Sequence, residues 1–77
     1  MTEIAFFLIS LDRSTPAAVA REVRRIDGVV EAHVTMGEYD VIVRAERETT
    51  KGFPVVASAI QRIEGVTKVS TCAVVEV

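Results

Sequence analysis

Met36-Gly37-Glu38-Tyr39-Asp40 joins two runs, residues 30–35 and 39–46, in which apolar and polar side chains alternate. A period of two residues indicates strands that are buried on one face. If Gly37 and Glu38 form the loop, the glycine takes the first position of a type II′ turn, where φ is positive and a side chain would clash. The stretch therefore predicts a tight β-hairpin.

The tight turn determines which residues of the two strands face one another, because a shift by one residue would turn every side chain to the other face. One face of this ribbon is expected to be apolar. The other is mostly polar, with Glu31 opposite Arg44 as a cross-strand ion pair. The expected pairs are Met36–Tyr39, Val34–Val41, Ala32–Val43 and Val30–Ala45 on the apolar face, and Thr35–Asp40 and His33–Ile42 on the polar face.

The rest of the chain predicts two more strands and two helices. Residues 4–11 are the most apolar run, with apolar side chains on both faces, so this strand is expected in the middle of a sheet. Helices are predicted within 15–28 and 53–65, because each range has an apolar stripe, a proline near its start and a glycine at its end. Residues 66–77 alternate again and predict the last strand.

The chain also repeats itself, since Arg25-Ile26-Asp27-Gly28-Val29 returns 37 residues later as Arg62-Ile63-Glu64-Gly65-Val66. We therefore predict one domain over residues 1–77 with an α+β, ferredoxin-like βαββαβ fold. Both helices would cover one face of a four-stranded antiparallel sheet. The other face would expose one side of the strand 4–11, so we expect two sheets to pack together as a dimeric α/β barrel.

Size and composition limit the classes of function. A chain of 77 residues buries only about 60% of its unfolded surface, so oligomerisation would stabilise it. No apolar run reaches the length needed to cross a bilayer, and the single cysteine permits no internal disulfide. Eleven acidic against nine basic residues, with no Lys/Arg cluster interleaved with aromatic residues, argue against direct binding to nucleic acid. We expect a cytoplasmic protein without a membrane partner.

The chain offers few groups for catalysis. His33 is the only histidine, and we expect a half-buried interface residue rather than an acid, base or ligand. Cys72 lies in an apolar strand without an activating base, so we expect a packed and unreactive thiol. No CxxC pair occurs, and the glycines lack the spacing of a phosphate-binding loop. The sequence therefore predicts no catalytic residue, no metal and no cofactor.

The hairpin turn is the one place that suits a small ligand. Asp40 is a carboxylate beside the ring of Tyr39, at a turn with partly free backbone N–H groups. The carboxylate of an amino acid could accept bonds from those donors while its ammonium group meets Asp40. The alternative is structural: Gly37 makes the turn, Tyr39 packs and Asp40 caps the strand. The spacing alone favours the structural role.

A resemblance to a known family changes that balance. Residues 37–43 read Gly-Glu-Tyr-Asp-Val-Ile-Val, and they follow the segments 25–29 and Ala32-His33-Val34. Together these segments closely resemble the effector-binding domain of the Lrp/AsnC transcription regulators, the RAM domain, and the likeness spans nearly the whole chain. It implies a ferredoxin-like unit that dimerises through its sheets, often forms rings, and binds amino acids between subunits near this hairpin.

The resemblance also implies the site. The family's glycine, aromatic and acidic turn positions fall on Gly37, Tyr39 and Asp40, whereas Met36 departs from the small polar residue common there. Family regulators carry an N-terminal helix-turn-helix, and this chain begins with the first strand, so it resembles a stand-alone RAM protein. The predicted ligand-binding residues are Gly37, Glu38, Tyr39, Asp40, Ser70 and Thr71.

The leading hypothesis is an amino-acid-sensing oligomerisation module, a homodimer that assembles further into a ring. It would act through mixed assemblies with a full-length Lrp/AsnC regulator. One alternative is a small dimeric α/β-barrel enzyme, a monooxygenase or isomerase, in which His33 and Tyr39 supply the acid and base. The predicted register argues against it, because it places these two side chains on opposite faces. The other alternative is a structural partner without a ligand.

Overall fold

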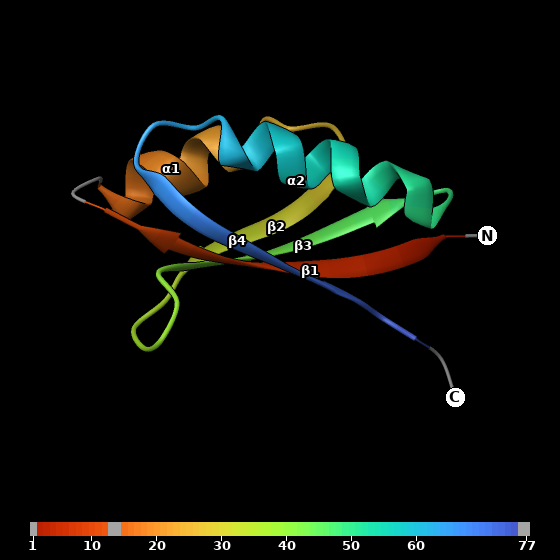
Figure 1. Cartoon of the computed structure of the whole chain (residues 1–77), viewed down its shortest axis with the longest axis horizontal. Helices are drawn as coiled ribbons and strands as arrows, with labels where there is room; N and C mark the ends of the chain where they lie inside the picture. The colour runs from red at the N-terminus through yellow and green to blue at the C-terminus, as the bar shows by residue number, and fades with distance from the viewer. Residues whose placement is uncertain (1, 13–14, 76–77) are drawn as a thin grey trace.

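The structure is a computed structural model that describes residues 2–12 and 15–75. Four strands form one antiparallel sheet in the order β2-β3-β1-β4, and both helices lie on one face of it (Figure 1). This arrangement confirms the predicted ferredoxin-like fold and places β1 in the interior of the sheet. The elements are β1 (Glu3–Leu11), α1 (Pro16–Val23), β2 (Val29–Val34), β3 (Val41–Arg47), a 3-10 helix η1 (Thr50–Gly52), α2 (Phe53–Gln61) and β4 (Val66–Ala73).

The core lies between the sheet and the helices. Strands β1 and β3 each direct every second side chain toward the helices, and the rings of Phe7 and Phe53 meet edge to face with centroids 6.3 Å apart. Because Phe53 is the first residue of α2, this contact anchors the start of that helix on the central strand. The fully or almost fully buried core residues are Ala5, Phe7, Ile9, Val19, Ala20, Val23, Ala32, Val41, Val43, Ala45, Phe53, Val56 and Ile60.

The two helix-to-strand junctions confirm the internal repeat. Gly28 and Gly65 have φ of 99° and 95°, a conformation that favours glycine, and their carbonyls accept hydrogen bonds of 2.8 Å from the backbone N–H groups of Glu46 and Asp12. The helices themselves end before these glycines, at Val23 and Gln61, so the predicted helix ends were wrong. Hydrogen bonds that span three residues tighten the chain after each helix and carry it to the glycine.

The hairpin is wider than the predicted two-residue turn. Its ladder closes where the N–H of Thr35 donates to the carbonyl of Asp40 at 3.0 Å, which leaves a four-residue loop over 36–39. The hydroxyl of Thr35 donates to the carbonyl of Tyr39 at 2.7 Å. In a type II′ turn that carbonyl would bond the N–H of Met36, so the threonine replaces the tight turn with a looser one. Gly37 does have a positive φ, 152°.

Two irregularities in the ladders correct the predicted pairing. Val29, not Val30, lies opposite Ala45, because the register shifts between Val29 and Glu31. Val30 is consequently 48% exposed. The alternation of residues 66–77 predicts Val66 on the same face as Lys68. A second shift in the ladder, at the end of β1, instead places Val66 on the core side of the sheet. Bulges of this kind add one residue to one strand and move later side chains to the other face.

The face of the sheet away from the helices is called the open face below, and no described segment covers it (Figure 1). An apolar stripe runs along β1 and continues onto β3, and Phe6 within it is 37% exposed. Cys72, which was expected to be packed, is exposed opposite Phe6. The loop over 36–39 projects from the sheet on this same side (Figure 1). The open face comprises Ile4, Phe6, Leu8 and Ser10 of β1, Ile42, Arg44 and Glu46 of β3, Glu31 and His33 of β2, and Lys68, Ser70 and Cys72 of β4.

Candidate ligand-binding site at the hairpin end of the open face

Asp40 joins the hairpin to the central strand. One of its carboxylate oxygens, Oδ2, accepts a hydrogen bond of 2.8 Å from the N–H of Leu11, and its own N–H donates to the carbonyl of Ile9 at 2.9 Å. Leu11 is the last residue of β1 and lies where the regular ladder to β4 shifts. The carboxylate therefore satisfies a backbone donor at an irregular point, which is the structural role that the spacing favoured. Its other oxygen, Oδ1, has no hydrogen-bond partner among the described residues and can act as an acceptor there.

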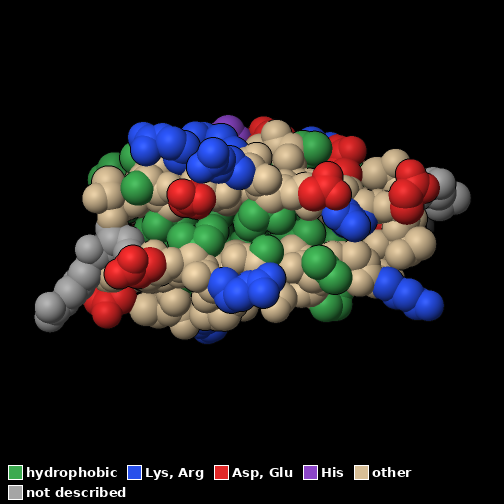
Figure 2. All heavy atoms as spheres, turned by 90° about the horizontal axis from the view of Figure 1, so that it is seen from above, with side chains coloured by type: hydrophobic (Ala, Val, Ile, Leu, Met, Phe, Trp, Pro, Cys, Tyr) green, Lys and Arg blue, Asp and Glu red, His purple; other side chains and the backbone are tan. Residues whose placement is uncertain are grey.

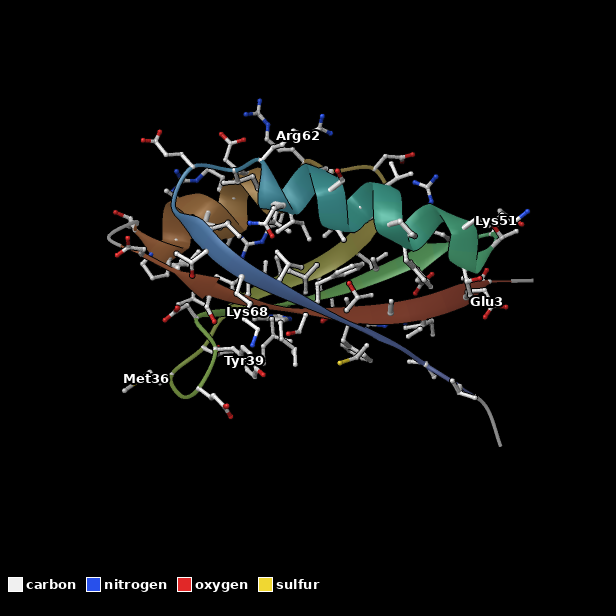
Figure 3. The ribbon with its side chains drawn as sticks, viewed as in Figure 1. Glu3, Met36, Tyr39, Lys51, Arg62 and Lys68 are labelled. Atoms are coloured by element: carbon white, nitrogen blue, oxygen red, sulfur yellow. The ribbon has the colours of Figure 1, made fainter. Side chains whose placement is uncertain are left out.

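The loop over 36–39 presents backbone donors and an aromatic ring. Its N–H groups make no backbone hydrogen bond to another described residue, whereas the N–H groups on either side, those of Thr35 and Asp40, are both used. Tyr39 is partly buried and lies below the sheet, on the side of the open face (Figure 3). Glu38 and Met36 are exposed, and Met36 is at the tip of the loop (Figure 3).

The two predicted site residues of β4 lie on opposite faces. Ser70 is opposite Leu8 and belongs to the open face, on the same side as the hairpin loop. Thr71 is opposite Phe7, whose side chain is in the core, and therefore lies on the helix side of the sheet. Of the six predicted residues, the structure thus gathers the four of the hairpin at one end of the open face, places Ser70 on that face, and separates Thr71 from them.

Two residues that the sequence did not propose for the site also lie at this end of the open face. Ser10 is opposite Lys68, and Asp40 bonds to the residues on both sides of Ser10 along the other edge of β1. Lys68 is exposed, and Figure 3 shows it on the same side of the sheet as Tyr39. The alternation of β4 places Lys68 on the same face as Ser70, and this pattern is the sequence signal that could have identified the lysine.

Within the described residues, the hollows found in the single chain lie away from the hairpin. One hollow, of about 770 Å³, is bounded by Asp12, by α1 and by the end of α2. It lies on the helix-covered side of the molecule, where apolar side chains form a strip between two rows of charged side chains (Figure 2). The other, of about 640 Å³, surrounds Arg47. The loop over 36–39 and Ser70 line neither of these two hollows.

Comparison with known families now identifies the chain. The sequence profile of the Lrp/AsnC ligand binding domain matches residues 4–77, which is nearly the whole chain. The chain belongs to this family. Comparison with curated protein sequences found no match.

Solved structures share the fold of this chain. TTHA0845 from Thermus thermophilus superposes with a TM-score of 0.88 at 22% identity, over 97% of this chain and 95% of that chain. PHS023 from Pyrococcus horikoshii has a TM-score of 0.85 at 27% identity, over 99% and 92%. The transcriptional regulator NMB0573 from Neisseria meningitidis, whose structure is a complex with L-Met, has a TM-score of 0.79 at 21% identity, over 96% of this chain and 50% of that one.

A network of charged side chains lies beside the apolar stripe of this Lrp/AsnC domain. His33 Nε2 is 3.0 Å from Glu31 Oε1, and Arg44 bridges Glu31 at 3.2 Å and Glu46 at 2.7 Å, which confirms the predicted pair of Glu31 and Arg44. The hydrogen bond with the His33 imidazole, followed by the one from Arg44, lowers the pKa of the Glu31 carboxyl below its usual range.

His33 is exposed in the single chain, although the sequence predicted a half-buried residue. The predicted tight turn placed His33 and Tyr39 on opposite faces of the sheet. In the structure Tyr39 belongs to the loop that projects on the open side, so both residues lie on the same side of the sheet. No hydrogen bond joins the two side chains among those of the described residues.

The described part of the chain also contains no helix long and apolar enough to cross a membrane.

Proposed function

We propose that the chain is an amino-acid-binding regulatory module that performs no chemistry. Two copies pack with their open faces together, and the effector binds between subunits beside the hairpin loop. The observation that carries this proposal is that the loop projects on the same side as the uncovered apolar stripe (Figure 1). A second copy on that stripe would bury it and would turn the surface beside the loop into an enclosed site.

The ligand class follows from the groups at that end of the sheet. Asp40 Oδ1 is an acceptor for an ammonium group, and the free backbone N–H groups of the loop are donors for a carboxylate. Gly37, Glu38, Tyr39, Asp40 and Ser70 would contact the ligand, and Thr71 would reach it only from another subunit. The related regulator from Neisseria meningitidis, in complex with L-Met, supports an amino acid as the effector.

Regulation would come from the link between ligand and assembly. A ligand that is bound between subunits stabilises the assembly that holds it, by about 2.7 kcal/mol at a concentration of 100 times Kd. We propose that the dimers associate further into a ring. We also propose that the module forms mixed assemblies with a full-length Lrp/AsnC regulator and acts on transcription through that partner.

Thermal unfolding against each common amino acid at millimolar concentration tests the proposal, with the oligomer mass measured by light scattering on the same samples. We expect at least a dimer, and we expect one amino acid to raise the midpoint or change the mass. A folded monomer at micromolar concentration would refute the packing of open faces. A stable oligomer that responds to no amino acid would refute the effector and leave the structural partner.

A further inference from the structure

We infer that Lys68, with Ser10 beside it, forms the cationic end of the amino-acid site and selects ligands that carry a free carboxylate. The inference rests on the proposed function and deepens it. It adds a side chain of β4, across the central strand from Asp40, to the backbone donors of the loop as a partner for the ligand's carboxylate.

Lys68 is opposite Ser10 on one side of β1, and on the other side Asp40 bonds to the two neighbours of Ser10. Neighbouring strands are about 4.8 Å apart, so the backbones of Lys68 and Asp40 are separated by about 10 Å with Ser10 between them. Side chains that reach inward from both ends leave room for one small zwitterion lying across β1.

Lys68 has no ion-pair partner among the described residues, although other charged side chains of the open face are paired with one another. Covering this face with a second copy would remove water from around the ammonium group, and an unpaired charge in such a place is costly. A ligand carboxylate would supply the missing partner, while Asp40 Oδ1 takes the ligand's ammonium group.

Lys68, Ser70 and Ser10 all belong to the open face, and Figure 3 shows Lys68 and Tyr39 on that same side. The hydroxyls of Ser10 and Ser70 flank the lysine along and across the strands, so they can complete the shell of donors around a carboxylate. These groups form a bipolar site that a neutral amide or a simple amine would fill only in part.

The test compares each amino acid with its carboxamide, because the amide keeps the ammonium group and the side chain but removes the negative charge. L-Methionine and L-methioninamide are the first pair, and the same comparison is made for any other amino acid that stabilises the wild type in the thermal panel. Isothermal titration calorimetry on the intact oligomer measures Kd for the wild type, Lys68→Met, Lys68→Arg and the control Lys51→Met. Lys51 is an exposed lysine of η1 that lies at the far end of the molecule (Figure 3).

We expect the wild type to bind the acid roughly ten- to hundredfold more tightly than the amide, the range of a charge-assisted hydrogen bond. Lys68→Met should bind both weakly and nearly equally, Lys68→Arg should keep the preference, and Lys51→Met should behave as the wild type. If Lys68→Met retains the preference for the acid, the role of Lys68 is refuted while the effector stands. If no amino acid binds the wild type, both proposals fail.

Discussion

Asp40 has a structural role and a proposed role in binding, which one pair of substitutions can separate. In Asp40→Ala the N–H of Leu11 loses its acceptor, and in Asp40→Asn the side-chain carbonyl oxygen can still accept that bond without a charge. A partly buried hydrogen bond to a charged group contributes about 2 kcal/mol, which is equivalent to a fall of roughly 8–16 °C in the unfolding midpoint for a domain of this size. We therefore expect such a fall for Asp40→Ala and less than half of it for Asp40→Asn.

The affinity for the amino acid should depend on the charge at position 40 and not on the stability of the variant. Both variants lose the partner of the ligand's ammonium group, so both should bind the amino acid at least about tenfold more weakly than the wild type. Differential scanning calorimetry at one protomer concentration measures stability, because the midpoint of an oligomer depends on concentration, and calorimetric titration measures Kd. Equal destabilisation by Ala and Asn would refute the structural role, and an unchanged Kd in Asp40→Asn would refute the role in binding.

Three further predictions concern the rest of the fold. Phe6→Glu places a charge on the open face and should give a folded monomer by light scattering, whereas Val55→Glu, at an exposed site on α2, should leave the mass unchanged. Gly28→Ala should lower the free energy of unfolding by about 1–2 kcal/mol in urea titrations, because φ is positive there and a Cβ would lie 2.7 Å from Cδ of Arg47; no change would contradict the strain. Because its neighbours lower the pKa of Glu31 in the fold, its carboxylate stabilises the protein above the unfolded pKa, and this contribution disappears as the pH falls through the lower folded pKa. The difference in free energy of unfolding between the wild type and Glu31→Gln should therefore shrink in acid. A difference that is constant with pH would contradict a stabilising role of the Glu31 carboxylate.

The sequence predicts the order of the elements because its strong signals are local. Alternating residues define the strands, and prolines and glycines bracket the helices, so β1 is predicted as the central strand with one uncovered face. The width of the hairpin depends on one hydroxyl, that of Thr35, which takes the carbonyl of Tyr39. Nothing in the spacing of the residues distinguishes a loop with that bond from a tight turn, so the predicted turn type was wrong.

The site was predictable only in part, for a related reason. Glycine, an aromatic ring and a carboxylate mark the hairpin itself, but the neighbours of Asp40 depend on how β1 and β4 pair. Ser10 comes to lie opposite Lys68 through the pairing of β1 with β4, and the alternation within each strand does not determine which residues of the two strands are paired. The enclosed site that we propose would require a second copy, whose position the pattern of one chain does not determine.

The bond between Asp40 and Leu11 has a consequence for observing the site. The Leu11 amide proton is held by the same carboxylate that would receive the effector, so its exchange with deuterium reports on what that carboxylate does. An effector that uses the free oxygen would slow the exchange of this proton, because it would hold the carboxylate more firmly in place. An effector that draws the carboxylate away from the strand would speed it. One backbone signal at the end of the central strand can thus distinguish these two modes of occupancy without a label on the ligand.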